Sequence, residues 1–408
     1  MRRLLLVTHR SIEQPGGPAA RWRAFARYLP EQGWELEVLN ATERPGASEF
    51  DSGASRAVAA RAEAMARLAR LSEPLFRFAG LRPDALPLSM AWIPQGALLV
   101  RRKVARRPPD VVLATGPPIA GLIAARAGIH TRIPLVVELR DLWAGNPAFD
   151  AGGQMLSKVE NWLLKDARRV VACTPEAVSD LRLRHPRLGQ RAVQIANGFD
   201  PEIRSIASQA AVAQATGQMR TSGSRHPLTI LHSGTLTAAR PIAPLVRALG
   251  AGRLAGSFRL VLHGYLTPSS QAEVERTRRE GNVAIEVLGP SPWRDAIAHI
   301  AQADAGLIVQ AHAAGDQTAV ASKIYEYLAL EKPVLCITDG GASEALLHRL
   351  GAGELCARLD APETILGALS RLREGAVSRP PPELLAPYSR RAQAAQMARL
   401  LEEVAREA

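Results

Sequence analysis

The sequence predicts an α/β fold with two doubly wound parallel-sheet domains that face each other across a cleft. Two observations lead to this expectation. Short apolar runs alternate with segments that have apolar residues at helical spacing along most of the chain, which is typical of βαβ units. The runs are apolar at successive positions rather than at every second one, so the sheets should be parallel and covered by helices on both faces.

The first domain is expected at residues 1–200, and it begins with a strand, a turn-rich loop, a helix at 18–29 and a second strand. This start is Rossmann-like. Gly16 and Gly17 lie in the loop, where the backbone could approach a ligand closely or could simply be flexible. No GxGxxG sequence is present, so the ordinary dinucleotide fingerprint is absent. The strands are predicted at residues 4–9, 35–40, 111–115, 134–139, 169–174 and 192–197.

The segment between the second and third strands is basic. Helices are expected at 55–71 and after Pro94. A basic amphipathic segment could lie against an anionic membrane surface, and a solvated helix face explains the pattern at least as well. The arginines of its first part are Arg56, Arg61, Arg67, Arg70, Arg77 and Arg82.

The second domain is expected at residues 228–388. Residues 201–227 are poor in large apolar side chains and rich in Ala, Ser, Gln and Gly, which predicts a helix followed by an interdomain linker. A charged amphipathic helix should occupy 389–408. The strands are predicted at 228–232, 258–263, 283–288, 305–310 and 333–338.

The composition points to an anionic partner. The chain has 51 Lys and Arg against 39 Asp and Glu, a net charge of +12, so a nucleotide, a nucleic acid or an acidic membrane would be attracted. Aromatic residues make up only 4% and the basic residues are dispersed, which argues against nucleic acid because stacking platforms are scarce.

The cysteines and apolar runs indicate a cytoplasmic protein that could touch a membrane. Cys173, Cys336 and Cys356 show no metal-ligand spacing, and the first two lie in apolar runs, as buried thiols would. The N-terminal apolar run is too short for a signal sequence. No run approaches the ~20 apolar residues of a membrane span.

The segment at 321–334, ASKIYEYLALEKPV, is the main candidate for a functional element. It should form a short helix with Ser322 as its N-cap. Lys323 and Glu326 share a face of this helix, beyond the end of an apolar strand, where open α/β sheets bind ligands. A phosphate at the helix N-terminus would explain Lys323, and Glu326 could then hold sugar hydroxyls. The alternative is a surface ion pair.

A second candidate is the loop that follows the strand at 228–232. Gly234, the Thr235 hydroxyl and the Arg240 guanidinium suit a diphosphate, whose oxygens accept hydrogen bonds from backbone amides and from a forked cation. Many βα turns contain Gly and Thr, so the loop alone is not specific. Because the carboxyl ends of parallel strands lie on one edge of a sheet, the candidate helix should lie near this loop.

In the first domain, Asp141 is the candidate acid, base or electrostatic residue, with Arg140 beside it. A structural interpretation is equally open, in which Asp141 caps a turn and Arg140 pairs with a carboxylate. His9 and His232 also end strands, although a histidine that is satisfied by backbone hydrogen bonds is more common than a catalytic one. No Ser-His-Asp spacing, P-loop or metal-ligand cluster is present. The other residues expected at this edge are Gly16, Gly17, Arg21, Thr115, Gly116, Trp143, Thr174 and Asn197.

These segments resemble a known family, the retaining glycosyltransferases with two Rossmann-like domains, called GT-B, and family 4 in particular. Each segment alone is loose, but they occur in the family's order across nearly the whole chain. They are the Gly16-Gly17 loop, ELRDLW at 138–143, VVACTPE at 170–176, IANGFD at 195–200, HSGTLTAAR at 232–240 and SKIYEYLALEKPVL at 322–335.

The resemblance implies a metal-independent transferase without a cofactor. It would move a sugar from a nucleotide-diphosphate donor to a glycan, lipid-linked or small-molecule acceptor, with retained anomeric configuration. The residues that it implies for the donor are Gly16, Gly17, Gly234, Thr235, Arg240, Ser322, Lys323 and Glu326. Arg240, Lys323 and the glycine amides would contact the diphosphate, and Glu326 the ribose. The candidate catalytic residues are Asp141, Arg140 and Lys323.

One position departs from the family's pattern. The earlier glutamate of the paired-glutamate motif, which normally contacts the donor sugar, would fall at Thr318. The sugar is therefore open, and the alternative is a catalytically silent GT-B subunit that binds a nucleotide or a protein partner. The expected setting is polysaccharide biosynthesis in the cytoplasm, where the protein could lie peripherally on the inner face of the membrane.

Overall fold

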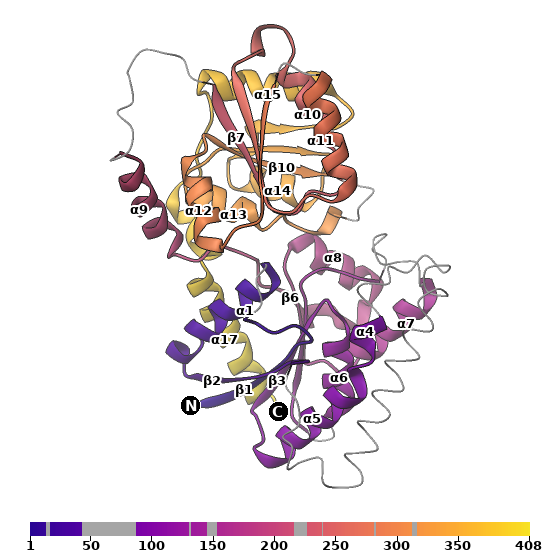
Figure 1. The fold of residues 1–408 in the computed structure, drawn as a ribbon. Helices are drawn as coiled ribbons and strands as arrows, with labels where there is room; N and C mark the ends of the chain where they lie inside the picture. The colour runs from indigo at the N-terminus through magenta and orange to yellow at the C-terminus, as the bar shows by residue number, and fades with distance from the viewer. Residues whose placement is uncertain are drawn as a thin grey trace. The chain divides into compact units, whose positions relative to one another are not determined.

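The computed structural model describes residues 1–13, 17–42, 87–129, 132–144, 153–215, 227–238, 240–280, 283–311 and 316–408. They form two compact units (Figure 1). The N-terminal unit comprises Met1–Ala196 and Gln393–Ala408, and the C-terminal unit comprises Asn197–Ala392. Each unit contains one six-stranded sheet in which the paired strands are parallel. The prediction of two doubly wound parallel-sheet domains is thereby confirmed.

The N-terminal sheet has the order β2-β1-β3-β4-β5-β6. Its strands are β1 (Arg2–Val7), β2 (Trp34–Leu39), β3 (Val111–Gly116), β4 (Leu135–Leu139), β5 (Arg169–Ala172) and β6 (Ala192–Gln194). The helices are α1 (Gly17–Tyr28), α4 (Pro87–Met90), α5 (Ile93–Arg106), α6 (Ala120–Gly128), α7 (Gly153–Leu164), α8 (Pro175–Arg184) and most of α17 (Arg390–Arg406).

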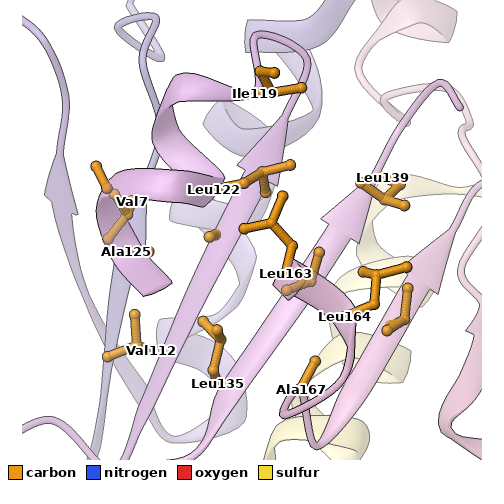
Figure 2. Packing of buried hydrophobic residues seen from close by; sticks show 14 of the residues in the cluster. Val7, Val112, Ile119, Leu122, Ala125, Leu135, Leu139, Leu163, Leu164 and Ala167 are labelled. Carbon is orange, nitrogen blue, oxygen red and sulfur yellow. The ribbon is translucent and has the colours of Figure 1, made fainter. Parts of the chain in front are cut away.

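Both faces of the N-terminal sheet are covered. On one face, Val7 of β1 belongs to a core with side chains of α5, α6, α7 and α8, including Leu163 (Figure 2). On the other face, Leu6 packs in a core with Trp22 of α1 and Met397 of α17, which is yellow in Figure 1. Because successive side chains of a strand point to opposite faces and both are buried, the strands are apolar at every position.

The C-terminal sheet has the order β12-β11-β10-β7-β8-β9. Its strands are β7 (Leu228–Ser233), β8 (Phe258–His263), β9 (Ala284–Leu288), β10 (Ala305–Gln310), β11 (Val334–Thr338) and β12 (Cys356–Ala357). The helices are α9 (Ile203–Ala215), α10 (Ala243–Leu249), α11 (Pro268–Glu280), α12 (Trp293–Gln302), α13 (Lys323–Ala329), α14 (Ala342–Arg349), α15 (Pro362–Glu374) and α16 (Pro382–Leu385). Side chains of α10, α11 and α15 belong to one core, and those of α9, α12, α13, α14 and α16 to another.

The eleven predicted strands are all present, with ends that differ by three residues at most. The two-residue strand β12 was not predicted, because it is too short to give a pattern. The helices predicted at 18–29, after Pro94 and at 389–408 correspond to α1, α5 and α17, whereas the helix predicted at 55–71 lies outside the described residues.

The unit boundaries differ from those predicted. Helix α9 is the helix predicted in residues 201–227, and Ile203 and Ile206 place it in a core of the C-terminal unit. The two isoleucines, three residues apart, give α9 an apolar stripe although the segment as a whole is polar. The predicted C-terminal helix, α17, contributes its apolar side to the N-terminal unit.

A buried ion pair joins α1 to β4 in the N-terminal unit. Arg21 of α1 and Glu138 of β4 are 1% and 0% exposed, and Nε of Arg21 donates to Oε1 of Glu138 at 3.0 Å. Trp22 and Thr115 donate to Oε2 at 2.7 and 2.6 Å, and Arg21 also donates to backbone carbonyls at residues 195–196. Burial alone would raise the pKa of Glu138, but Arg21 and these hydrogen bonds hold it below its ordinary value.

We expect Arg21→Met to lower the free energy of unfolding by about 3–5 kcal/mol, because Glu138 would stay buried without its counter-charge. The matched control is Arg107→Met, which breaks an exposed pair with Glu35 (2.8 Å) and should cost at most about 1 kcal/mol. Because the pKa of Glu138 is depressed in the fold, its contribution is present above the ordinary glutamate pKa of about 4.3 and is lost as the pH falls further. Urea denaturation at neutral and acidic pH measures both effects. Equal stability of Arg21→Met and wild type at pH 7 would contradict this assignment.

Candidate functional site

The carboxyl edge of the C-terminal sheet contains most of the residues predicted to bind a ligand. β7 ends at Ser233 and leads into Gly234 and Thr235, while the chain after β10 returns through α13, which begins at Lys323. β7 and β10 are hydrogen-bonded neighbours, and the strand order reverses between them. Open α/β sheets bind ligands outside the carboxyl ends at such a switch point. The structure therefore brings the 234–240 loop and α13 to the same edge.

The loop after β7 is fastened to the loop after β8. Leu236 N donates to Tyr265 O at 2.9 Å, and Thr267 N donates to Leu236 O at 3.0 Å. Gly264 is required between them: its φ is +121°, and a Cβ there would lie 2.3 Å from the carbonyl oxygen of Gly234. Two backbone hydrogen bonds thus connect the described part of the predicted binding loop to its neighbour.

Tyr327 ties α13 to β7. The side chain is fully buried, and its ring lies so close to Gly306 of β10 that a Cβ on this glycine would come within 2.4 Å of it. The Tyr327 hydroxyl donates to Leu231 O at 3.1 Å and accepts from Ser233 N at 3.0 Å. Burial raises the pKa of Tyr327, so the hydroxyl keeps the proton that it donates. This contact fixes the position of α13 relative to the 234–240 loop.

Lys323 and Glu326 form an ion pair on α13. Nζ of Lys323 donates to Oε2 of Glu326 at 2.5 Å, and Nε1 of Trp293 lies 3.4 Å from Oε1. The ion pair that the sequence left open as an alternative is therefore present. It is not a remote surface pair, because both side chains are partly buried, at 24% and 13% exposed, and lie at the switch point.

Ser322 occupies the predicted N-cap position of α13 but does not cap the helix with its side chain. Ser322 has helical dihedrals, φ −58° and ψ −25°, and its side chain makes no capping hydrogen bond. Instead, Ser343 of α14 accepts a hydrogen bond from Ala321 N at 3.1 Å. Since α13 has only seven residues, its dipole is small, and the positive charge at this edge comes from the Lys323 and Arg240 side chains.

Arg240 and His232 flank the loop after β7 in the sequence. Nη1 of Arg240 donates to Thr235 O at 3.2 Å. Nδ1 of His232 lies 3.3 Å from Leu307 O and must donate, because a carbonyl only accepts. Burial and the Arg240 charge lower the pKa of His232 to about 4, so the ring is neutral at pH 7. Its buried Nε2 has no hydrogen-bond partner within the described residues.

In the N-terminal unit, Arg140 is engaged with the turn after β3. Its Nε donates to Gly116 O at 3.3 Å and its Nη2 to Pro117 O, while Glu138 and Asp141 compensate its charge. Asp141 is exposed, directly after Arg140. Gly17 is the first residue of α1, and Gly16 lies outside the described residues. The functional roles of Asp141, Arg140 and Gly17 remain predictions.

The sequence did not single out several polar residues at the C-terminal edge. His263 ends β8, and Ser291 and Trp293 follow β9. The signal for His263 was available, since it is the last residue of a correctly predicted strand. Thr318 lies in a short 3-10 turn, Asp316–Thr318, before α13. Among the described residues, no group of His, Cys, Asp and Glu side chains could hold a metal ion.

The predicted basic stretch is described only from residue 87 onward. There, Lys103 and Arg107 pair with Glu37 and Glu35, each at 2.8 Å, so part of its charge is neutralised locally. In the parts of the chain that the structure covers, no helix is both long and apolar enough to cross a membrane.

Tyr327→Phe should lower the free energy of unfolding by about 1–3 kcal/mol, because Ser233 N and Leu231 O lose their buried partner. The control is Tyr265→Phe, whose side chain is 57% exposed and whose hydroxyl is accessible to water, so the change should stay within about 0.5 kcal/mol. Urea denaturation of both variants is the measurement. A Tyr327→Phe protein as stable as Tyr265→Phe would show that the hydroxyl does not hold α13 in place.

Known proteins share both the domain and the fold. Residues 16–198 match the family model described as "Glycosyl transferase 4-like domain". No curated protein sequence matches the chain. Three solved structures illustrate the fold: a glycosyltransferase from Rickettsia africae, the Anabaena protein HepE in complex with UDP and glucose, and an α,α-trehalose-6-phosphate synthase from Burkholderia multivorans.

The structural likeness covers whole chains at low sequence identity. The TM-scores are 0.62, 0.57 and 0.66 in the same order, with 13%, 15% and 16% identity. Each match covers 100% of this chain, and 99%, 98% and 100% of the respective relative. At these low identities the structural matches establish the fold alone, and the family match identifies the domain at residues 16–198. The chain thus has the GT-B fold and contains a glycosyl transferase 4-like domain at residues 16–198.

Proposed function

We propose that the chain transfers a sugar from a nucleotide-diphosphate donor to an acceptor hydroxyl, with retained anomeric configuration and without a metal ion. The observation that carries this proposal is the carboxyl edge of the C-terminal sheet. There, Lys323, Glu326 and the 234–240 loop with Arg240 converge at the switch point, and Tyr327 fixes their spacing. HepE, which has the same fold, was crystallised with UDP and glucose.

In this proposal the C-terminal edge holds the leaving group. The bond from the anomeric carbon to the diphosphate oxygen breaks, and its electron pair stays on the diphosphate. Arg240 donates to Thr235 O in this structure, and Lys323 donates to Glu326. In the reaction, both side chains redirect N–H groups toward the negative charge that develops on the diphosphate, which lowers the barrier to its departure. When Lys323 turns, Glu326 becomes available to accept hydrogen bonds from ribose hydroxyls.

We assign the acceptor side to the N-terminal unit. A bond forms between the anomeric carbon and the acceptor oxygen, and Asp141 is the candidate to receive the proton that this hydroxyl loses. Arg140 would contribute positive charge beside it. A glycan, a lipid-linked sugar or a small molecule could be the acceptor, and a lipid-linked one would suit a chain that touches the inner face of an anionic membrane. Flotation with anionic vesicles tests that contact.

Titration with UDP-, ADP-, GDP- and dTDP-sugars in excess EDTA tests the donor. One of them should raise the melting temperature and be hydrolysed slowly, because water replaces the missing acceptor. Binding that appears only when a divalent ion is added would refute metal independence. Binding without any hydrolysis or transfer would instead favour a silent nucleotide-binding subunit.

Lys323→Ala and Glu326→Ala should each reduce transfer roughly ten- to a hundredfold, since a charge-assisted hydrogen bond to the donor contributes about 1.5–3 kcal/mol. Their melting temperatures should change little, because an ion pair of this spacing contributes only about 0.3–0.5 kcal/mol. The matched control is Glu275→Ala, which breaks the Glu275–Arg278 pair of the same spacing (2.9 Å) on α11. Transfer rates that stay at the control's level in both mutants would leave the α13 pair with a structural role only.

A further inference from the structure

Three polar side chains form a line across the ends of β7, β8 and β9. Ser233 and His263 are register partners on adjacent parallel strands, so their side chains lie on the same face of the sheet. Ser233 Oγ lies 3.2 Å from Nδ1 of His263, and Ser291 Oγ lies 2.9 Å from Nε2. His263 is buried, with 4% of its surface exposed. Both ring nitrogens therefore have a hydroxyl partner.

We assign the tautomer of His263 from its hydrogen-bond partners. Ser291 Oγ also lies 3.3 Å from Pro292 O, and we assign its hydroxyl as the donor to this carbonyl, which can only accept. The Ser291 oxygen then accepts from Nε2–H of His263, which leaves a lone pair on Nδ1. This lone pair accepts the hydroxyl hydrogen of Ser233. In this neutral form of His263, the Ser233 hydroxyl donates inward and is not available to another acceptor.

The groups around His263 disfavour its protonation unless an anion is present. Burial is the main cause that lowers the pKa of His263, and the charges of His299 on α12 and Lys323 on α13 lower it further. Asp295 on α12 raises it. The His299 ring lies 5.2 Å away. On β7, His232 is neutral, with Arg240 close to it, and Glu326 neutralises part of the Lys323 charge. A second positive charge here costs free energy until negative charge arrives.

We propose that His263 takes up a proton when a nucleotide diphosphate binds beside Lys323, and that the Ser233 hydroxyl then reverses its hydrogen bond. Protonated Nδ1–H donates to Ser233 Oγ, so the hydroxyl hydrogen of Ser233 is free to turn to a phosphate oxygen. No covalent bond forms or breaks apart from the proton taken from water. His263 is thus a positioning residue that couples donor affinity to pH. This inference rests on the proposed donor site.

The coupling has a definite sign. A bound diphosphate raises the pKa of His263 above its value in the free protein, so the bound state holds more protons between the two values. Donor affinity therefore increases as the pH falls through the bound-state pKa and levels off below the free-state pKa. Each unit of difference between the two pKa values corresponds to about a tenfold change in affinity.

Calorimetric titration measures the proton directly. The probes are UDP-glucose, ADP-glucose, GDP-mannose and dTDP-glucose, whose diphosphate diesters do not titrate near neutral pH. Each is titrated into the full chain in PIPES and in imidazole, buffers that differ in ionisation heat. The probe that binds best should show uptake approaching one proton near neutral pH and should bind several-fold more tightly at pH 6 than at pH 8.

Two histidine variants separate this coupling from general charge effects. His263→Asn should bind the same probe with little pH dependence and no proton uptake, because the asparagine amide does not titrate in this range. His299→Asn, a change of the same kind at the neighbouring ring, should keep the uptake. A ¹³C NMR titration of the His263 ring in wild type, with and without the probe, gives the same answer if His263→Asn does not fold.

The outcomes distinguish this inference from the proposed function. If none of the probes binds at either pH, the donor site is wrong and the inference falls with it. Binding without proton uptake, uptake that persists in His263→Asn, or a ring pKa that the probe leaves unchanged overturns the inference alone and leaves the donor site standing.

Discussion

The Tyr327 hydroxyl is the contact on which the geometry of the C-terminal edge depends. The Tyr327 ring lies against Gly306, where a side chain would clash with it. Its hydroxyl accepts a hydrogen bond from Ser233 N and donates one to Leu231 O, both on β7. A seven-residue helix has little stability of its own, so α13 keeps its place through tertiary contacts such as this one. Lys323 and Glu326 are therefore positioned by Tyr327 of the same helix, whose side chain is buried in the core.

The two sheets use their carboxyl edges differently. In the N-terminal unit, Arg21, Glu138 and Arg140 are engaged with each other or with backbone carbonyls, so their charge is compensated internally. In the C-terminal unit, Lys323 pairs with Glu326, Arg240 donates to the carbonyl of Thr235, and the buried Nε2 of His232 has no hydrogen-bond partner among the described residues. The edge with less internal compensation is the one that can respond to an anionic ligand.

The sequence predicted the strands well because a strand buried on both faces must be apolar at each position, as in LLLV of β1 and GLIV of β10. It also placed Gly234, Arg240 and Lys323 at one edge, which follows from parallel topology alone. It could not predict the Ser322 geometry, since helix ends are decided by tertiary partners such as Ser343. It missed Ser291 and Trp293, because neither the loop after β9 nor the first residue of α12 has an apolar periodicity that indicates its position. The helix predicted in residues 201–227 is present as α9, but the polar composition of this segment did not indicate that two isoleucines pack it into the C-terminal unit.

Helix α17 has a consequence for biosynthesis. Its Ala394, Met397 and Leu401 complete the core formed by α1 and by β1 at the start of the chain. A ribosome delivers these residues after every residue of the C-terminal unit has been made. Domains generally fold in the order of synthesis, yet here Leu4, Leu6 and Trp22 of the N-terminal unit lack their covering helix until α17 has been synthesised. The C-terminal unit, a continuous segment, can reach its native state before its predecessor does.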